Sequence, residues 1–485
     1  MHFRKSLAAA AAAIALLALP VTAQENRQKP AENAGILSLL PADSTTSHVL
    51  KTPAGNLAYT ATAGTLSLYG QDGNVTAKVF YTAYVAKEGG PKRPLTFAFN
   101  GGPGAASAYL NLGLVGPKIL EFGPNANDGT MPALKDNPES WLRFTDLVLI
   151  DPVGTGWSRA AGNESDRFWG VSQDAETIAK VVTLYIQHNN RTASPKYLLG
   201  ESYGGLRAAK VASALKENQG ILVSGIIMAS PLIEARLLFE ATDYPLGAAL
   251  QLPSLAAAEL ERKKAFSPEA LAAAERFAMT DYMVTLAGPA PTGARADAFY
   301  GRVAVLTGIP TDEVARARGF VGDIYTKATR SKSGKVVSPY DSAYDRSDDP
   351  ILDGFTRAYG AAFANYARQD LGYACDVTYN LLNTEVNRKW TWNGNRGEAE
   401  GTSDIRELLA TIPSFRLMIV HGYSDALTPY GASRYVLDHL PQTLANGRVS
   451  LKLYHGGHMF YTRPDSRRAM TEDARRFFAG ETSTE

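Results

Sequence analysis

The stretch Gly200-Glu201-Ser202-Tyr203-Gly204 decides the fold of this chain. An apolar run at residues 197–199 precedes it, and a helix-like segment at 206–215 follows it. A strand, a Gly-x-Ser-x-Gly turn and a helix in this order are typical of a nucleophile elbow, which exposes the serine hydroxyl. Glycines are needed on both sides because the turn is strained and side chains there would clash. The stretch therefore predicts Ser202 as a nucleophile at a strand end.

The composition is that of an ordinary globular protein. The 485 residues are 45% hydrophobic and 20% charged, with a net charge of +1. Such a balance does not indicate a nucleic-acid partner, which usually requires a basic excess. The single cysteine, Cys375, excludes a disulfide within this chain, and with no histidine nearby its expected role is core packing.

The N-terminus has the pattern of a secretory signal peptide. Residues 1–5 are basic, residues 7–19 form an apolar run, and Val21-Thr22-Ala23 offers a small-residue cleavage site. The alternative is a membrane anchor, but the run is short for a bilayer span. We expect a secreted or periplasmic protein, bacterial in type, cleaved near Ala23 and without stable membrane insertion afterwards. A flexible lead-in is expected at residues 24–44.

The rest of the chain predicts an α/β fold in three parts. Strand-like runs alternate with helical ones over residues 45–231, which predicts a mostly parallel central sheet flanked by helices, with antiparallel hairpins at its start. Residues 232–385 are expected to form a helical insertion that caps the sheet. Residues 386–485 resume the core. Ligands bind beyond the C-terminal strand ends of such sheets.

A serine nucleophile needs a base, and histidine is the usual one. Of seven histidines, His421, His455 and His458 follow late strand-like runs. We favour His458, because Gly456-Gly457 gives its loop freedom to reach over the sheet. His455 is the alternative, and His421 is expected to be a packed residue.

An acid should lie between the serine and the base in the chain order of this fold. Asp425 follows the apolar run at residues 415–420 and is placed to orient an imidazole. The alternative role is a solvated turn residue.

Acyl transfer also needs an oxyanion hole made of two backbone N–H groups. Tyr203, which follows the serine, should supply one of them. The loop Asn100-Gly101-Gly102-Pro103-Gly104, which follows an early strand, should supply the other, because its glycines let the backbone approach a substrate. A plain strand-to-helix turn is the alternative for this loop.

Together these motifs resemble the serine carboxypeptidase family of α/β-hydrolases. The likeness includes the Gly-Gly-Pro-Gly loop, the elbow, Asp151-Pro152-Val153-Gly154-Thr155-Gly156, Gly457-His458-Met459 and the stretch at residues 379–386. The resemblance implies a triad of Ser202, Asp425 and His458, and an oxyanion hole of Gly102 and Tyr203. It further implies that the C-terminal carboxylate of a peptide binds to Asn100, Gly101 and Glu201.

The chain departs from the family pattern at several positions. Ala98 stands where the family has Trp, Ala105-Ala106 replaces Cys-Ser, and Leu114 stands where an acidic partner of the carboxylate-binding glutamate is expected. These changes leave acyl transfer intact but weaken the carboxylate site.

The leading hypothesis is therefore a serine carboxypeptidase that acts on peptides with a free C-terminus. An esterase or acyltransferase with the same triad is the alternative, and a non-catalytic binding protein is a third possibility. No cofactor or metal is expected, because the chain has no His-Glu-x-x-His motif or cysteine–histidine cluster.

Overall fold

The computed structural model describes residues 35–481, except 54, 123–128, 163, 240–242, 326, 328–335, 339, 343–344 and 347–353. The predicted signal peptide and the start of the expected lead-in lie outside the described residues. The end of the expected lead-in is ordered instead of flexible, because Leu40 is buried in the main core and β1 begins at Ser44. Among the described residues, no helix has the length and apolar character needed to cross a bilayer.

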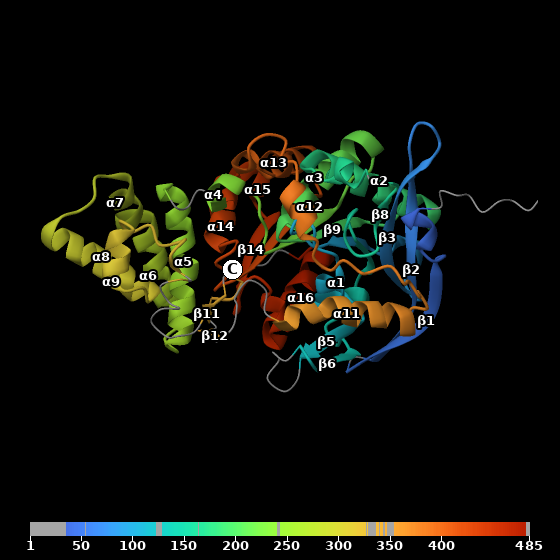
Figure 1. The fold of residues 1–485 in the computed structure, drawn as a ribbon, viewed down its shortest axis with the longest axis horizontal. Coiled ribbons are helices and arrows are strands. Elements are labelled where there is room, and N and C mark those ends of the chain that lie inside the picture. Colours follow the sequence, from blue (N-terminus) through green and yellow to red (C-terminus); the bar gives the residue numbers. More distant parts are fainter. Residues whose placement is uncertain are drawn as a thin grey trace, which may run out of the picture. The chain divides into compact units, whose positions relative to one another are not determined.

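One large mixed sheet organises the fold (Figure 1). Its strands along the order of pairing are β1 (Ser44–Thr52), β2 (Gly55–Tyr69), β3 (Val75–Ala86), β7 (Asp146–Ile150), β4 (Leu95–Phe99), β9 (Lys196–Glu201), β10 (Gly225–Ala229), β13 (Arg416–Gly422) and β14 (Val449–Tyr454), with β8 (Arg159–Ala160) beside β3. The first three strands pair antiparallel, as the hairpin pattern predicts, and β7 to β14 run parallel. Two small sheets pair β5 (Lys118–Phe122) with β6 (Pro132–Asp136) and β11 (Val336–Val337) with β12 (Asp345–Arg346).

Helices cover both faces of the parallel strands, which explains why those strands read as unbroken apolar runs. Ile226 and Ile227 of β10 are neighbours in sequence but lie in two different cores, one on each face. One face packs against α2 (Val171–His188), α3 (Tyr203–Gln219), α13 (Thr402–Thr411) and α14 (Tyr430–Asp438). The other packs against α11 (Gly354–Gln369) and α16 (Pro464–Ala479). Burying one Leu, Ile or Phe side chain fully stabilises the folded state by about 1.5–3 kcal/mol relative to leaving that side chain in water.

Most of the insertion forms a helical unit with a core of its own, made largely by α5 and α8 (Figure 1). Its helices are α5 (Pro245–Arg262), α6 (Pro268–Phe277), α7 (Met283–Ala287), α8 (Gly293–Thr307) and α9 (Thr311–Arg316). The sequence reads as helical over residues 255–275 with an interruption at Pro268, and the structure has that interruption. Ser267 caps α6 through the N–H of Ala270, and Pro268 takes the first position of the helix.

One helix of the expected cap belongs to the body instead. Tyr359, Phe363 and Tyr366 lie on one face of α11 at helical spacing and are buried in the main core. The helix contacts α1 (Ala108–Leu110), β5 and β6. Further short helices among the described residues are α4 (Ala235–Phe239), α12 (Thr384–Lys389) and α15 (Gln442–Ala445).

Candidate active site

Ser202 sits at the turn between β9 and α3, with φ 62° and ψ −128°. A non-glycine residue in this region is strained, at a cost of about 1–3 kcal/mol. The flanking glycines make the turn possible: a Cβ on Gly200 would lie 1.8 Å from the Gly204 carbonyl oxygen, and one on Gly204 would lie 2.7 Å from that of Phe99. The local sequence therefore builds the elbow, and the Ser202 side chain remains partly exposed.

Asp425 is fully buried in the loop after β13 and is held by several donors. Its Oδ1 accepts hydrogen bonds from the N–H groups of Leu427 and Thr428, each at 2.9 Å. Its Oδ2 accepts from the Thr428 hydroxyl at 2.8 Å and contacts His458 Nδ1 at 2.9 Å. This network fixes the direction of the carboxylate, as a group that orients an imidazole requires.

His458 lies in the loop after β14 and is buried with its ring against Asp425. Because the carboxylate accepts from Nδ1–H, Nε2 is left as the basic nitrogen. Burial lowers the pKa of His458, but the charge of Asp425, its hydrogen bond and the charge of Glu201 outweigh this, so the net pKa is raised. The hydrogen bonds among the described residues do not include one between His458 and the Ser202 hydroxyl. Such bonds often form only with substrate.

The other two candidate histidines have structural surroundings. His455 Nδ1 pairs with Glu261 Oε1 of α5 at 2.9 Å, and its side chain is largely exposed. His421 is fully buried with Nε2 2.8 Å from the Ser433 hydroxyl, and burial lowers its pKa to about 4. Neither ring contacts the Asp425 carboxylate through a hydrogen bond.

The glycine loop packs directly on the elbow. A Cβ on Gly101 would lie 2.5 Å from the backbone nitrogen of Tyr203. Gly102 is exposed and adopts φ 101°, which only glycine takes readily. Tyr203 is the first residue of α3, so its N–H has no acceptor inside the helix. The structure thus brings the two predicted oxyanion donors to neighbouring turns at the N-terminus of α3.

Glu201 and Asn100 lie together beside the imidazole. Asn100 Nδ2 donates to Glu201 Oε2 at 2.8 Å, and Glu201 Oε1 lies 3.8 Å from His458 Nε2. Burial raises the pKa of Glu201, although the charge of His458 and the hydrogen bond from Asn100 oppose this. Leu114, by contrast, is fully buried in the main core.

The negative charge of Glu201 acts on three tyrosine hydroxyls. Burial and then the charge of Glu201 raise the pKa of Tyr109, Tyr340 and Tyr461, so their hydroxyls stay protonated. Tyr340 comes from the insertion, and its ring packs edge-on to His458 with centroids 5.6 Å apart. Its carbonyl also accepts the His458 N–H.

Sequence reasoning missed several residues of this site. Thr428 stands three positions after Asp425, and that spacing could have suggested a local hydrogen bond to the acid. Tyr340 carries no such local signal, because its contacts with His458 join segments far apart in the chain. Asp151 begins the Asp-Pro-Val-Gly-Thr-Gly motif, for which the sequence predicts no individual role. It is buried, burial raises its pKa to about 7, and its Oδ1 accepts a hydrogen bond from the Ser107 N–H at 2.7 Å. This carboxyl therefore holds the start of α1 in place.

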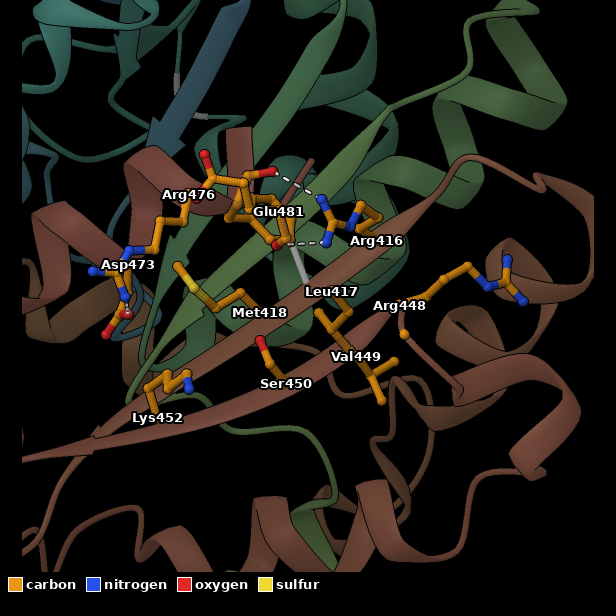
Figure 2. A pocket seen from close by; sticks show the side chains of 12 residues that line it. Arg416, Leu417, Met418, Arg448, Val449, Ser450, Lys452, Asp473, Arg476 and Glu481 are labelled. Carbon is orange, nitrogen blue, oxygen red and sulfur yellow. Dashed lines mark hydrogen bonds and ion pairs between the residues drawn. The ribbon is translucent and has the colours of Figure 1, made fainter. Parts of the chain in front are cut away.

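A small pocket of about 60 Å³ lies elsewhere, at the N-terminal ends of β13 and β14 beside α16 (Figure 2). There Arg416 donates to the carbonyl oxygens of Phe477, in the last turn of α16, and of Glu481, just beyond that helix. None of the predicted site residues lines this pocket. Within the part of the chain that the structure describes, no cluster of three or more His, Cys, Asp or Glu side chains could hold a metal ion.

This fold, with its elbow, glycine loop and two late loops at the C-terminal strand ends, defines an α/β-hydrolase. The comparison with family models is more specific. The model described as "Serine carboxypeptidase" matches residues 57–459, and the chain belongs to that family.

Individual relatives are distant. Serine carboxypeptidase-like 2 of Arabidopsis thaliana is 26% identical over 185 residues, 36% of this chain and 39% of the relative. Serine carboxypeptidase-like 51 of the same plant is 33% identical over 123 residues, 24% of each chain. The matched segments thus span less than half of these relatives' length. The crystal structure of Kex1(delta)p, a prohormone-processing carboxypeptidase from Saccharomyces cerevisiae, matches with a TM-score of 0.57 at 15% identity, covering 91% of this chain and 92% of that one.

Proposed function

We propose that this protein is a serine-type carboxypeptidase that releases C-terminal residues from peptides. Ser202 Oγ attacks the last peptide carbonyl while His458 Nε2 takes its proton, and Asp425 holds the imidazole. The C–N bond then breaks, and His458 returns the proton to the leaving amine. Water, deprotonated by the same imidazole, releases the acyl group from Ser202. The N–H groups of Gly102 and Tyr203 stabilise the oxyanion during both acylation and deacylation of Ser202.

The observation that carries the exopeptidase role is the pair of Glu201 and Asn100 beside the elbow. A C-terminal carboxylate next to the scissile bond needs donors close to the nucleophile. Asn100, the N–H of Gly101 and a protonated Glu201 supply them, and the raised pKa of Glu201 favours that protonated form. A deprotonated Glu201 would repel the same carboxylate.

One observation favours a second function, an esterase or acyltransferase on small molecules. The position where the family carries a second acid is Leu114, and it lies in the core rather than beside Glu201. The triad would act equally well on an ester that has no free carboxylate.

A single set of assays separates the two functions. The purified protein is incubated with a blocked dipeptide acid, the corresponding C-terminal amide and a simple ester, and is labelled with a fluorophosphonate. We expect the acid to be cleaved far faster than the amide, and Ser202→Ala to abolish cleavage and labelling. Ser213→Ala, in the same helix α3, is the matched control. Turnover of the ester alone rejects the carboxypeptidase, and absence of labelling rejects both functions.

We also propose that the protein is an exported, bacterial-type member of the family that does without disulfides. The signal-like residues 1–23 and the single cysteine support this. Expression in a bacterial host followed by N-terminal sequencing of the periplasmic fraction tests it. A mature chain that begins at Gln24 is expected, and an uncleaved chain in the cytosol would reject it.

A further inference from the structure

Arg207 is a buried cation directly behind the elbow. It lies one turn into α3 and is 1% exposed. Its Nη1 donates to the backbone carbonyl of Asn100, which is 107 residues away in the chain. Its guanidinium also lies 5.0 Å from the ring centroid of Tyr203 and 5.9 Å from that of Phe99. One side chain therefore touches both the glycine-loop segment and the elbow.

We propose that Arg207 is a positioning residue that locks the Asn100–Gly102 loop against the elbow and so sets the spacing of the two oxyanion donors. The proposal rests on the function given above. In this proposal Arg207 does not touch the substrate. It acts through the backbone of the Asn100–Gly102 loop and through the elbow.

Two physical effects follow from the contact with Asn100. The loop contains consecutive glycines, which lose more conformational freedom than other residues when they are ordered, so a fixed anchor is needed on their N-terminal side. The carbonyl that accepts from Arg207 belongs to the same peptide unit as the N–H of Gly101. A hydrogen bond from a cation polarises that unit and makes its N–H a stronger donor.

Asp174 keeps the arginine in place. Its Oδ2 accepts from Arg207 Nε at 2.6 Å, and both side chains are buried. Asp174 belongs to α2, so the anchor ties the glycine loop to two long helices that pack side by side. Arg207 Nη2 has no partner within hydrogen-bond distance among the described residues, so only Nε and Nη1 define its direction.

Arg191 provides a control for the loss of a buried arginine away from the elbow. It forms a second buried pair, 2.7 Å from Asp146, with exposures of 7% and 1%. Asp146 begins β7, at the strand ends away from the elbow. Removing Arg207 leaves the buried Asp174 without its cation, whereas Asp146 keeps an ion pair with Arg93 at 2.9 Å, so Arg191→Gln should cost less stability. Only Arg207 should change the reactivity of the serine.

The experiment compares Arg207→Gln, Arg207→Lys and Arg191→Gln at a temperature where thermal unfolding curves show all three to be folded. The readouts are the rate constant of inactivation by a fluorophosphonate, and kcat and KM for a blocked dipeptide acid and a simple ester. We expect Arg207→Gln to slow inactivation at least about tenfold, because small misplacements of reacting groups are costly. It should lower kcat for both substrates and raise KM for the acid alone. Arg191→Gln should stay within about twofold of the unchanged protein.

Arg207→Lys keeps the charge but reaches only one of the two partners, so it should recover part of the lost rate. If Arg207→Gln does not fold, Asp174→Asn takes its place, with a smaller loss in the same parameters. Inactivation of Arg207→Gln at the unchanged rate, or equal losses in Arg207→Gln and Arg191→Gln, would overturn the proposal. Failure of the unchanged protein to react with the probe would instead reject the function on which it rests.

Discussion

Glu201 should make substrate binding depend on pH. Burial raises its pKa, so the protonated form persists to a higher pH than for an exposed glutamate. The protonated form donates to a substrate carboxylate, and the anion repels it. We therefore expect KM for a blocked dipeptide acid to rise between about pH 4 and about pH 8, measured by initial rates across that range.

Two comparisons make this result specific. Glu201→Gln keeps a donor at every pH, so its KM should stay level, although the loss of charge near His458 will also change kcat. A neutral ester substrate should show no rise in KM with the unchanged protein. If KM for the dipeptide acid does not change across this pH range, Glu201 does not bind the substrate carboxylate.

The helix α11 illustrates how packing decides the role of an element. It was expected to be part of the cap, yet its aromatic face fills the main core. Helical periodicity alone says that one face is buried, but not against which partner. We expect Phe363→Ala to lower the free energy of unfolding by about 3–5 kcal/mol, as measured by urea denaturation.

Asn365→Ala, on the exposed side of the same helix, is the control and should stay within about 0.5 kcal/mol of the unchanged protein. Equal effects of the two substitutions would mean that the helix does not pack on the body through its aromatic face.

At the scale of the whole molecule, the insertion reaches the loops that carry the acid and the base. Its Ser342 hydroxyl donates to the Ser424 carbonyl at 2.8 Å, next to Asp425. Its Tyr340 carbonyl meets the His458 loop so closely that a Cβ on Gly457 would lie 1.9 Å from that oxygen. The insertion thus both faces the site and holds its loops.

We expect Gly457→Ala to lower kcat/KM at least about tenfold, because the added methyl pushes the His458 loop and the insertion apart. Gly301→Ala in α8 is the control: a Cβ there meets nothing within 4 Å, and the change should add roughly 0.5–1 kcal/mol of stability. Steady-state kinetics and thermal unfolding of both variants test this. Normal activity in Gly457→Ala would show that the close contact does not constrain the base.

The sequence by itself determined the features that local backbone geometry demands. The elbow around Ser202, the loop of Gly101 and Gly102 and the breaks between strands and helices are encoded by glycines and apolar runs within a few residues. The alternation of strands and helices was enough to predict the sheet, because burial on both faces requires it. These features can be read without knowing which distant segments meet.

Only the tertiary structure decided which distant residues contact the elbow and the glycine loop. The bond between His458 and Asp425, the anchor from Arg207 to Asn100 and the approach of Tyr340 all join segments brought together by the packed sheet. A single sequence shows which side chains the protein contains, but it does not show which of them lie within contact distance of one another. Contacts of this kind depend on the summed packing of many elements, and no short pattern encodes them.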